Sequence, residues 1–151
     1  MIKIVQGDLL SANADVICQQ VNCQGVMGAG LAKEIYTKWP CVKRMYQSFC
    51  KAVGDPYMLL GMVYVIQIPD VPFIIANVFG QLNYGRQRVC YTSYDALRTA
   101  FTKIHNTYPT DKIVAFPYGF GCGLAGGDWK TVLNIIDECF TGRTVLVYKK
   151  E

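Results

Sequence analysis

The sequence predicts a single α/β domain over residues 1–151, a three-layer α/β/α sandwich with a mixed central sheet. Short β-branched or aromatic runs alternate with segments of helical periodicity along the whole chain. More strand-like runs occur at the start and in the middle than a simple parallel alternation needs, which indicates a mixed sheet. With 52% hydrophobic and 17% charged residues, the chain has enough apolar material for one core.

The first part of the chain contains two predicted strands and two predicted helices. The strands cover residues 2–6 and 15–21, which are rich in β-branched side chains. A helix over 30–39 ends before Pro40, because proline cannot continue it. A second helix, which ends at Gly54, is marked by an apolar stripe at helical spacing: Val42, Met45, Phe49 and Val53.

The middle of the chain predicts two strands and a long helix. Residues 60–68 and 73–79 are separated by a tight proline-containing loop, as in a hairpin or a pair of adjacent strands. Thr92 is the expected N-cap of the helix, with Asp95 at its third position. One face of this helix is apolar: Tyr94, Leu97, Phe101 and Ile104.

The last part predicts a strand, a helix and a final strand. The strands cover residues 112–117 and 144–148. The helix between them is marked by an apolar face: Val132, Ile135, Ile136 and Cys139.

Two glycine-rich loops, residues 22–30 and 118–124, each follow a predicted strand and precede a predicted helix. The free amides at a helix N-terminus bind anions such as phosphate. Ligands in α/β sheets bind beyond the carboxyl ends of the strands, where both loops should meet. The pair of loops therefore predicts a diphosphate held between them.

Charge and cysteine content narrow the classes of function. The net charge of +4 suits an anionic small ligand, but the basic residues are too scattered to indicate nucleic acid on their own. The seven cysteines show no C-x-x-C spacing and His105 is the single histidine, so we expect no metal site. An odd cysteine count without a secretory signal predicts free thiols and a cytoplasmic location. No apolar run is long enough to predict a membrane span.

Motifs in three regions, in this order, resemble those of the macrodomain family, an ADP-ribose-recognising α/β/α fold. They are Gly7-Asp8-Leu9-Leu10, the run from Asn22 to Ala32, and Gly121-Cys122-Gly123-Leu124 with Trp129. The motif sequences are most similar to those of the branch that contains terminal ADP-ribose protein glycohydrolases and the antitoxins that reverse DNA ADP-ribosylation. The yeast-type ADP-ribose-1''-phosphate phosphatases are more distant.

The resemblance implies that ADP-ribose is the ligand and that the reaction needs no cofactor. Asp8 would bind the adenine amino group, and the two loops would hold the diphosphate and the distal ribose. The further ligand-binding residues that it implies are Leu9, Asn22, Gly25, Val26, Met27, Gly28, Ala29, Gly30, Pro117, Tyr118, Gly119, Phe120, Gly121, Cys122, Gly123 and Leu124.

The catalytic residues depart from the family pattern. In the related glycohydrolases a lysine attacks the distal ribose and an aspartate supports it, but Gln81 and Ala125 stand at these positions here. Neither can form or support a Schiff base. We therefore expect attack by water, assisted by Asp128 or Asn22, with Gln81 or Tyr84 orienting the ribose. Alternatively, Asp128 is only the N-cap of the last helix and Asn22 bonds only to loop backbone.

These observations lead to three functional hypotheses. The first is a hydrolase that removes ADP-ribose from acidic side chains of proteins or from nucleobases, and Arg86 would then contact an acidic or phosphorylated leaving group. The second is a non-catalytic ADP-ribose reader. The third is a hydrolase of ADP-ribose-1''-phosphate or O-acetyl-ADP-ribose. The expected partners are ADP-ribose or an ADP-ribosylated macromolecule, with nucleic acid included and membranes excluded, and the expected state is a monomer.

Overall fold

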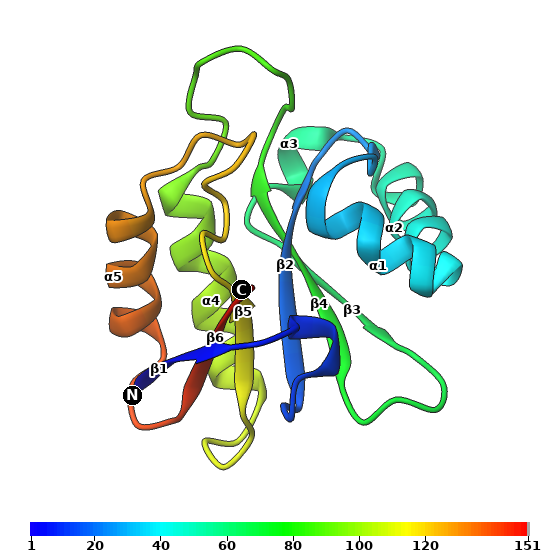
Figure 1. Ribbon diagram of the computed structural model, residues 1–151. Helices are drawn as coiled ribbons and strands as arrows, with labels where there is room; N and C mark the ends of the chain where they lie inside the picture. The colour runs from blue at the N-terminus through cyan, green and yellow to red at the C-terminus, as the bar shows by residue number, and fades with distance from the viewer. Residues whose placement is uncertain (151) are drawn as a thin grey trace.

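The computed structural model, which describes residues 1–150, places a six-stranded sheet between two layers of helices (Figure 1). The strands are β1 (Ile2–Gln6), β2 (Val16–Asn22), β3 (Val63–Gln67), β4 (Ile74–Gln81), β5 (Val114–Pro117) and β6 (Val145–Lys149). Their order is β1-β6-β5-β2-β4-β3. Neighbouring strands run parallel, but β3 is antiparallel to β4, so the predicted mixed sheet is confirmed.

Helices cover both faces of this sheet, which confirms the predicted three-layer sandwich. They are the short 3-10 helix η1 (Leu9–Ser11), α1 (Gly30–Lys38), α2 (Pro40–Val53), α3 (Pro56–Leu59), α4 (Tyr94–Thr107) and α5 (Trp129–Cys139). The helices α1 and α2 pack on one face, and α4 and α5 pack on the other (Figure 1).

Local sequence signals account for most of the helix boundaries. α2 begins with Pro40 in its first turn and ends at Gly54, whose φ of 82° is a left-handed conformation that favours glycine. The four-residue helix α3 was not predicted, because Asp55, which accepts a hydrogen bond from the Tyr57 amide, caps too few apolar residues to produce a periodic pattern. β3 starts at residue 63 rather than 60, because Gly61 turns the chain with a φ of 88°.

One predicted cap is wrong by one residue. Ser93, not Thr92, is the N-cap of α4, and its hydroxyl accepts a hydrogen bond from the Ala96 amide at 3.2 Å. The Thr92 side chain is buried and bonds to Gln20 and to the Gly121 carbonyl instead. The Thr92 hydroxyl, which the local sequence assigns to the helix cap, therefore forms tertiary hydrogen bonds instead.

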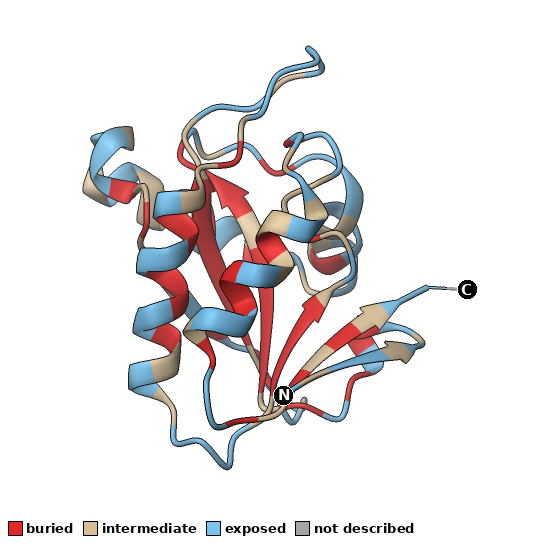
Figure 2. Ribbon diagram, turned by 90° about the vertical axis from the view of Figure 1, so that its left-hand side faces the viewer, coloured by how far each residue is buried: buried red, intermediate tan, exposed pale blue. Residues whose placement is uncertain are grey.

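The core consists of two apolar layers, one on each face of the sheet. Most residues of the central strands β2, β4 and β5 are buried, as Figure 2 shows in red. Under α4 and α5, the Phe101 ring packs 5.2 Å from Phe116, 5.7 Å from Phe120 and 5.6 Å from Phe140 between centroids. Clustered aromatic rings of this kind contribute large buried apolar areas.

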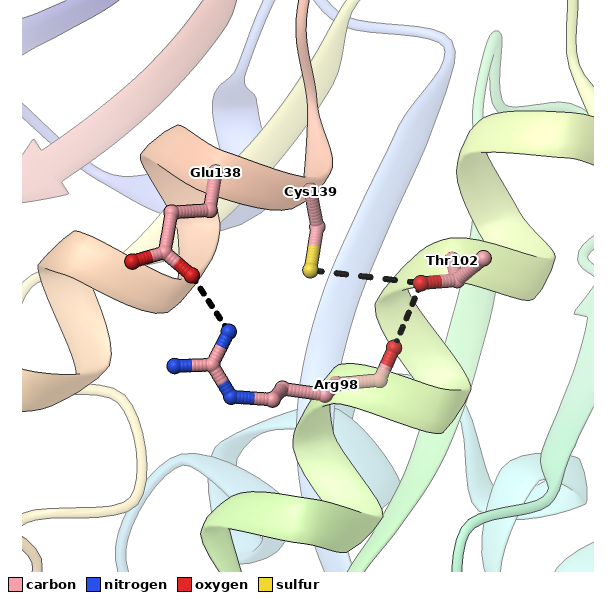
Figure 3. Close-up of polar contacts among 4 residues, drawn as sticks. All are labelled: Arg98, Thr102, Glu138 and Cys139. Atoms are coloured by element: carbon pink, nitrogen blue, oxygen red, sulfur yellow. Dashed lines mark hydrogen bonds and ion pairs between the residues drawn. The ribbon is translucent and has the colours of Figure 1, made fainter.

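Polar contacts between α4 and α5 lie at the surface of the second layer (Figure 3). Arg98 forms an ion pair with Glu138, and the Thr102 hydroxyl is 2.7 Å from the Arg98 carbonyl and 4.0 Å from the Cys139 sulfur. The side chains of Arg98 and Glu138 are exposed, and solvent screens such pairs. The aromatic cluster beneath them, rather than this ion pair, holds the two helices to the sheet.

The parallel strands bring three loops to one edge of the sheet. The segments 23–29, 82–92 and 118–128 follow the neighbouring parallel strands β2, β4 and β5, which all run upward in Figure 1. This is the edge at which the sequence predicts a ligand. Within residues 1–150, the structure has no helix that combines the length and the apolar character needed to cross a membrane.

Candidate functional site

A groove along the carboxyl edge of the sheet is made of three adjoining cavities. The proximal cavity, of about 330 Å³, is lined by Asp8, Leu9 and Tyr118 among others. The middle cavity, of about 280 Å³, shares Tyr118 with it. The distal cavity, of about 600 Å³, shares Gln81 with the middle one and extends to Arg86. Volumes of this order are typical of sites for small organic ligands.

Most of the residues predicted to bind ADP-ribose line this groove. Asp8 and Leu9 lie at its proximal end, and the first and second glycine loops form its walls. The exceptions are Gly25, Gly30 and Cys122, which do not line any of the three cavities. The structure thus brings the predicted residues together, and their contact with a ligand remains a prediction.

The side chain of Asn22 shapes the first glycine loop. Its Oδ1 accepts hydrogen bonds from the amides of Gln24 at 3.0 Å and Val26 at 3.3 Å, and its Nδ2 donates to the Val26 carbonyl at 2.7 Å. The Tyr46 hydroxyl of α2 lies 2.6 Å from the Asn22 carbonyl and donates to it. Burial raises the pKa of Tyr46, so this phenol remains a donor at all ordinary pH values. Asn22 lines the distal cavity, but these contacts favour a loop-shaping role.

The N-terminus of α1 opens into the groove. Ala29 occupies the N-cap position, and its methyl group cannot accept a hydrogen bond from the first-turn amides. Ala29 and Ala32 line the middle and distal cavities, and the first turn contains no acidic residue. A Cβ added to Gly28 would meet no protein atom within 4 Å. Unoccupied amides and the positive end of a helix dipole make this a suitable place for a phosphate.

The second glycine loop is a compact series of turns. Gly119 and Gly121 have φ values of 77° and 73°, which favour glycine. The Cys122 amide donates to the Gly119 carbonyl at 2.8 Å, and the Gly127 amide donates to the Gly121 carbonyl at 2.9 Å. A Cβ on Gly127 would lie 2.6 Å from that carbonyl oxygen, so the loop has no space for a side chain there.

Gln20, in β2, is joined to the end of β4 and, through Thr92, to the second glycine loop, and the sequence analysis did not single it out. Its Nε2 donates to Gln81 Oε1 and to Thr92 Oγ1, both at 2.9 Å, and the Thr92 hydroxyl donates to the Gly121 carbonyl at 2.7 Å. Gln20 Oε1 is buried and has no hydrogen-bond partner among residues 1–150. It fills a niche that exists because Gly80 and Gly121 have no side chains, since added Cβ atoms would lie 2.4 and 2.9 Å from it. The adjacent glutamines Gln19 and Gln20, inside a strand that is otherwise mostly apolar, were the signal that could have identified it.

Gln81 and Ala125 both line the groove. By the resemblance, they stand at the positions of the lysine and the aspartate of the related glycohydrolases. Gln81 Oε1 accepts from Gln20, and its Nε2 donates to the Asn83 carbonyl at 2.9 Å. The polar side chains that line the distal cavity are amides, a phenol and a guanidinium: Gln20, Asn22, Gln81, Tyr84 and Arg86. Among the residues described as lining this cavity there is no carboxylate, imidazole or amine.

Asp128 caps α5 and does not line the groove. Its Oδ2 accepts hydrogen bonds from the Thr131 amide at 3.0 Å and the Thr131 hydroxyl at 2.8 Å. These two bonds lower the pKa of the Asp128 carboxyl. The geometry therefore supports the capping alternative, and the catalytic role of Asp128 stays a prediction without a supporting contact.

Cys122 lies in the second loop but is not an activated thiol. Its sulfur is 3.3 Å from the Phe120 carbonyl, and burial raises its pKa to about 11. A thiol with this pKa is protonated at neutral pH and is a poor nucleophile. Among residues 1–150, no group of three or more histidine, cysteine or acidic side chains is arranged to hold a metal ion.

Comparisons with known proteins relate this geometry to a family, although no family model matches the chain. A DNA ADP-ribosyl glycohydrolase of Mycobacterium tuberculosis is 29% identical over 142 residues, which cover 93% of this chain and 39% of that protein. An ADP-ribose 1''-phosphate phosphatase of Scheffersomyces stipitis is 36% identical over 73 residues, 44% of this chain and 42% of that protein. The chain thus matches about two fifths of the length of these curated relatives.

Among solved structures, the macrodomain of Mycobacterium tuberculosis DarG superposes with a TM-score of 0.79 at 26% identity, over 98% of this chain and 97% of that one. The mixed six-stranded sheet between two helical layers is the macrodomain fold. The resemblance that the sequence motifs indicated is confirmed: this protein has the macrodomain fold and is similar to the macrodomain of DarG.

Proposed function

We propose that this macrodomain binds ADP-ribose in the groove and hydrolyses the bond that joins ADP-ribose to a modified macromolecule. The open N-terminus of α1, which faces a groove between two glycine loops, carries the proposal because it offers free amides for a diphosphate. The names of the relatives support the reaction, since one is a DNA ADP-ribosyl glycohydrolase and another an ADP-ribose 1''-phosphate phosphatase.

The proposed ligand runs along the groove with its adenine at the proximal end. Asp8 is exposed there, and its Oδ1 accepts from the Leu10 amide at 3.0 Å, so that Oδ2 is free to accept from an exocyclic amine. The diphosphate lies at the N-terminus of α1, opposite the turns of the second loop. The distal ribose then occupies the distal cavity, with Asn22 and Gln81 in its wall.

The proposed reaction breaks the bond between C1'' of the distal ribose and the carrier. The carrier leaves with a proton, and the oxygen of a water molecule adds to C1''. Glycosidic cleavage passes through an oxocarbenium-like state, which the negative diphosphate a short distance away would stabilise. Gln81 would orient the ribose, and Asn22 would act by keeping the loop in shape. With an amide at position 81, the protein has no lysine there to form a covalent intermediate.

A binding assay run together with a turnover assay tests this proposal. The protein is titrated with ADP-ribose by calorimetry and then incubated with a glutamate-linked ADP-ribosylated peptide and a guanine-linked ADP-ribosylated oligonucleotide. We expect binding, and release of free ADP-ribose from one of the two substrates, which would identify the linkage. Binding without release from either substrate would contradict the hydrolase part, and the absence of binding would contradict the whole proposal.

A non-catalytic reader is the second candidate, and the lining of the distal cavity favours it. Its described polar side chains include no group that could act as a general base near neutral pH. The double variant Gln81→Lys, Ala125→Asp restores the residue types of the related glycohydrolases at the positions of the resemblance. A wild-type protein that binds without turnover, together with a double variant that releases ADP-ribose, would establish the reader.

A hydrolase of ADP-ribose-1''-phosphate is the third candidate, favoured by the partial match to the phosphatase of Scheffersomyces stipitis. Release of inorganic phosphate from this compound is the measurement that decides it. We further propose that the protein acts as a monomer in the cytoplasm. Analytical ultracentrifugation and localisation of a tagged chain test these two points.

A further inference from the structure

A fourth cavity, of about 410 Å³, continues the groove beyond its distal end, and we call it the outer cavity. It shares Arg86 and Leu124 with the distal cavity. Arg88, Val89 and other residues of the segment between β4 and α4 form its other walls. Figure 1 shows this segment in green, rising above the carboxyl edge of the sheet. A group attached to the distal ribose would enter this space.

The outer cavity is positively charged. Arg86 and Arg88 both line it, and none of the residues described as lining it is acidic. The ion pairs found within residues 1–150 join Arg98 to Glu138 and Lys150 to Glu34, so neither Arg86 nor Arg88 is in one. Guanidinium groups with no acidic partner are well suited to bind phosphate, which accepts paired hydrogen bonds from their planar fork.

The segment that carries these arginines is packed against the second glycine loop. The amides of Tyr91 and Thr92 both donate to the Ala125 carbonyl, at 2.6 and 3.2 Å. A Cβ on Gly126 would lie 2.4 Å from the Val89 carbonyl oxygen, so the two segments meet without space for a side chain. The arginines are therefore held beside the groove by backbone contacts on one side of them.

We propose that Arg86 and Arg88 form a subsite for a phosphate on the far side of the distal ribose. This inference rests on the proposed function, because it takes the groove to be the ADP-ribose site. An ester-linked acidic side chain has lost its charge and would not need two arginines. A phosphate beyond the ribose keeps its charge, and the half-exposed side chains of Val89 and Leu124 offer apolar walls to the group that carries it.

Two sources of such a phosphate differ in distance from the ribose. A phosphate bonded directly to C1'' would lie in the distal cavity and reach Arg86, which lines both cavities. The phosphodiester next to a modified nucleoside would lie farther out and reach Arg88, which lines only the outer cavity among the four described here. The two arginines therefore distinguish the sources.

The test compares Arg86→Gln and Arg88→Gln with Arg44→Gln, a matched loss of charge on the exposed side of α2 and outside the groove. Four ligands are titrated: ADP-ribose, ADP-ribose-1''-phosphate, an ADP-ribosylated nucleoside whose nucleoside part carries no phosphate, and an ADP-ribosylated trinucleotide. We expect each ligand without an outer phosphate to bind the Arg88→Gln variant within about twofold of wild type. At least one of the two ligands that carry a phosphate beyond the distal ribose should lose about tenfold in affinity for Arg86→Gln or Arg88→Gln, as expected for a lost charge-assisted contact.

The pattern of losses identifies the source. Loss for ADP-ribose-1''-phosphate with Arg86→Gln alone supports a phosphate on C1''. Loss for the trinucleotide with Arg88→Gln, and a weaker salt dependence of its binding, supports a phosphodiester. The subsite is overturned if all ligands lose affinity equally, or if no variant differs from Arg44→Gln.

The failure of this inference can be separated from the failure of the proposed function. If the wild-type protein binds ADP-ribose, but the arginine substitutions change the affinity for all four ligands by the same factor, the subsite is contradicted and the proposed function is not. A wild-type protein that does not bind ADP-ribose contradicts both. Because both arginines are exposed, we expect the melting temperatures of the variants to match that of Arg44→Gln, which excludes misfolding as the cause.

Discussion

The first glycine loop, residues 22–30, and the second, residues 118–124 with its continuation to residue 127, both join a parallel strand to a helix. Their helices begin differently. The N-cap of α1 is Ala29, which has no side-chain acceptor, whereas the N-cap of α5 is Asp128, whose carboxylate accepts a hydrogen bond from the Thr131 amide. The first helix can therefore offer its terminal amides and dipole to an anion, while the second already has an anion at that position.

The glycines of the two loops also serve different purposes. A Cβ on Gly28 would enter open space, whereas a Cβ on Gly127 would collide with the Gly121 carbonyl oxygen at 2.6 Å. Glycine in the first loop leaves the groove free, and in the second it lets the chain pack on itself. The comparison indicates that only the backbone turns of the second loop, and not the start of its helix, can contribute to a diphosphate site.

The largest expected effect comes from giving the first loop the cap of the second. The N-cap residues Ala29 and Asp128 both have extended backbone, so Ala29→Asp should fit. We expect the free energy of unfolding to rise by about 1 kcal/mol, since the new carboxylate satisfies terminal amides. We expect ADP-ribose affinity to fall about 100-fold, because the carboxylate takes those amides and repels the diphosphate. Chemical denaturation and calorimetry measure the two effects.

Ala29→Asn is the matched control, because it caps the helix without charge. It should give a similar gain in stability, and its loss of affinity should be smaller by about tenfold. Wild-type affinity in the aspartate variant would show that no anion binds at α1.

The second effect concerns packing of the loops. Gly127→Ala should lower the free energy of unfolding by about 2 kcal/mol, because the new methyl group overlaps backbone that is part of a turn. Gly28→Ala should leave stability within about 0.5 kcal/mol of wild type. It should instead weaken ADP-ribose binding, since Gly28 lines the distal cavity. Urea denaturation of both variants tests this difference, and equal losses of stability would contradict it.

The third effect tests whether Asp128 is more than a cap. Asp128→Ala should lower the melting temperature by a few degrees and leave ADP-ribose affinity and release unchanged. The pKa of Asp128 is lowered in the folded protein, so its stabilising effect is present above the ordinary aspartate pKa and is lost as pH falls through the folded value. The difference in melting temperature between wild type and variant should therefore shrink in acid.

Kinetics on the same variant decide the catalytic prediction made from the sequence. A loss of turnover with unchanged affinity would support a catalytic role for Asp128, because only stabilisation of the transition state would have been removed.

The smallest effect concerns the cysteine that each loop carries. Burial raises the pKa of Cys23 to about 12 and that of Cys122 to about 11, from an ordinary value of 9.0. The folded state favours the neutral thiols, so their contribution to stability is complete below about pH 9 and is lost as pH rises through 11 to 12. At pH 7.5 iodoacetamide should modify exposed Cys90 faster than either thiol, as followed by mass spectrometry. In urea the three rates should become similar.

The sequence predicted the layers of the fold because the strands and the long helices α1, α2, α4 and α5 each carry their own periodicity, whereas the four-residue α3 has none. It assigned the cap of α4 to Thr92 instead of Ser93, because adjacent hydroxyl residues are equivalent in the local sequence until a tertiary partner such as Gln20 binds one of them. It placed both glycine loops at the same edge, because parallel strands require it. It could not show which helix N-terminus is open, although Ala29 and Asp128 contain that difference in their side chains.

The contacts of Gln20 have a consequence for protein engineering. Its single amide group joins the ends of β2 and β4 to the second loop through Thr92, and the niche around its oxygen needs glycine at positions 80 and 121. A loop grafted from a different protein of the same fold would bring new sequence without this partner. The transferable unit is therefore not a loop but a set of four positions, 20, 80, 92 and 121, drawn from distant parts of the chain.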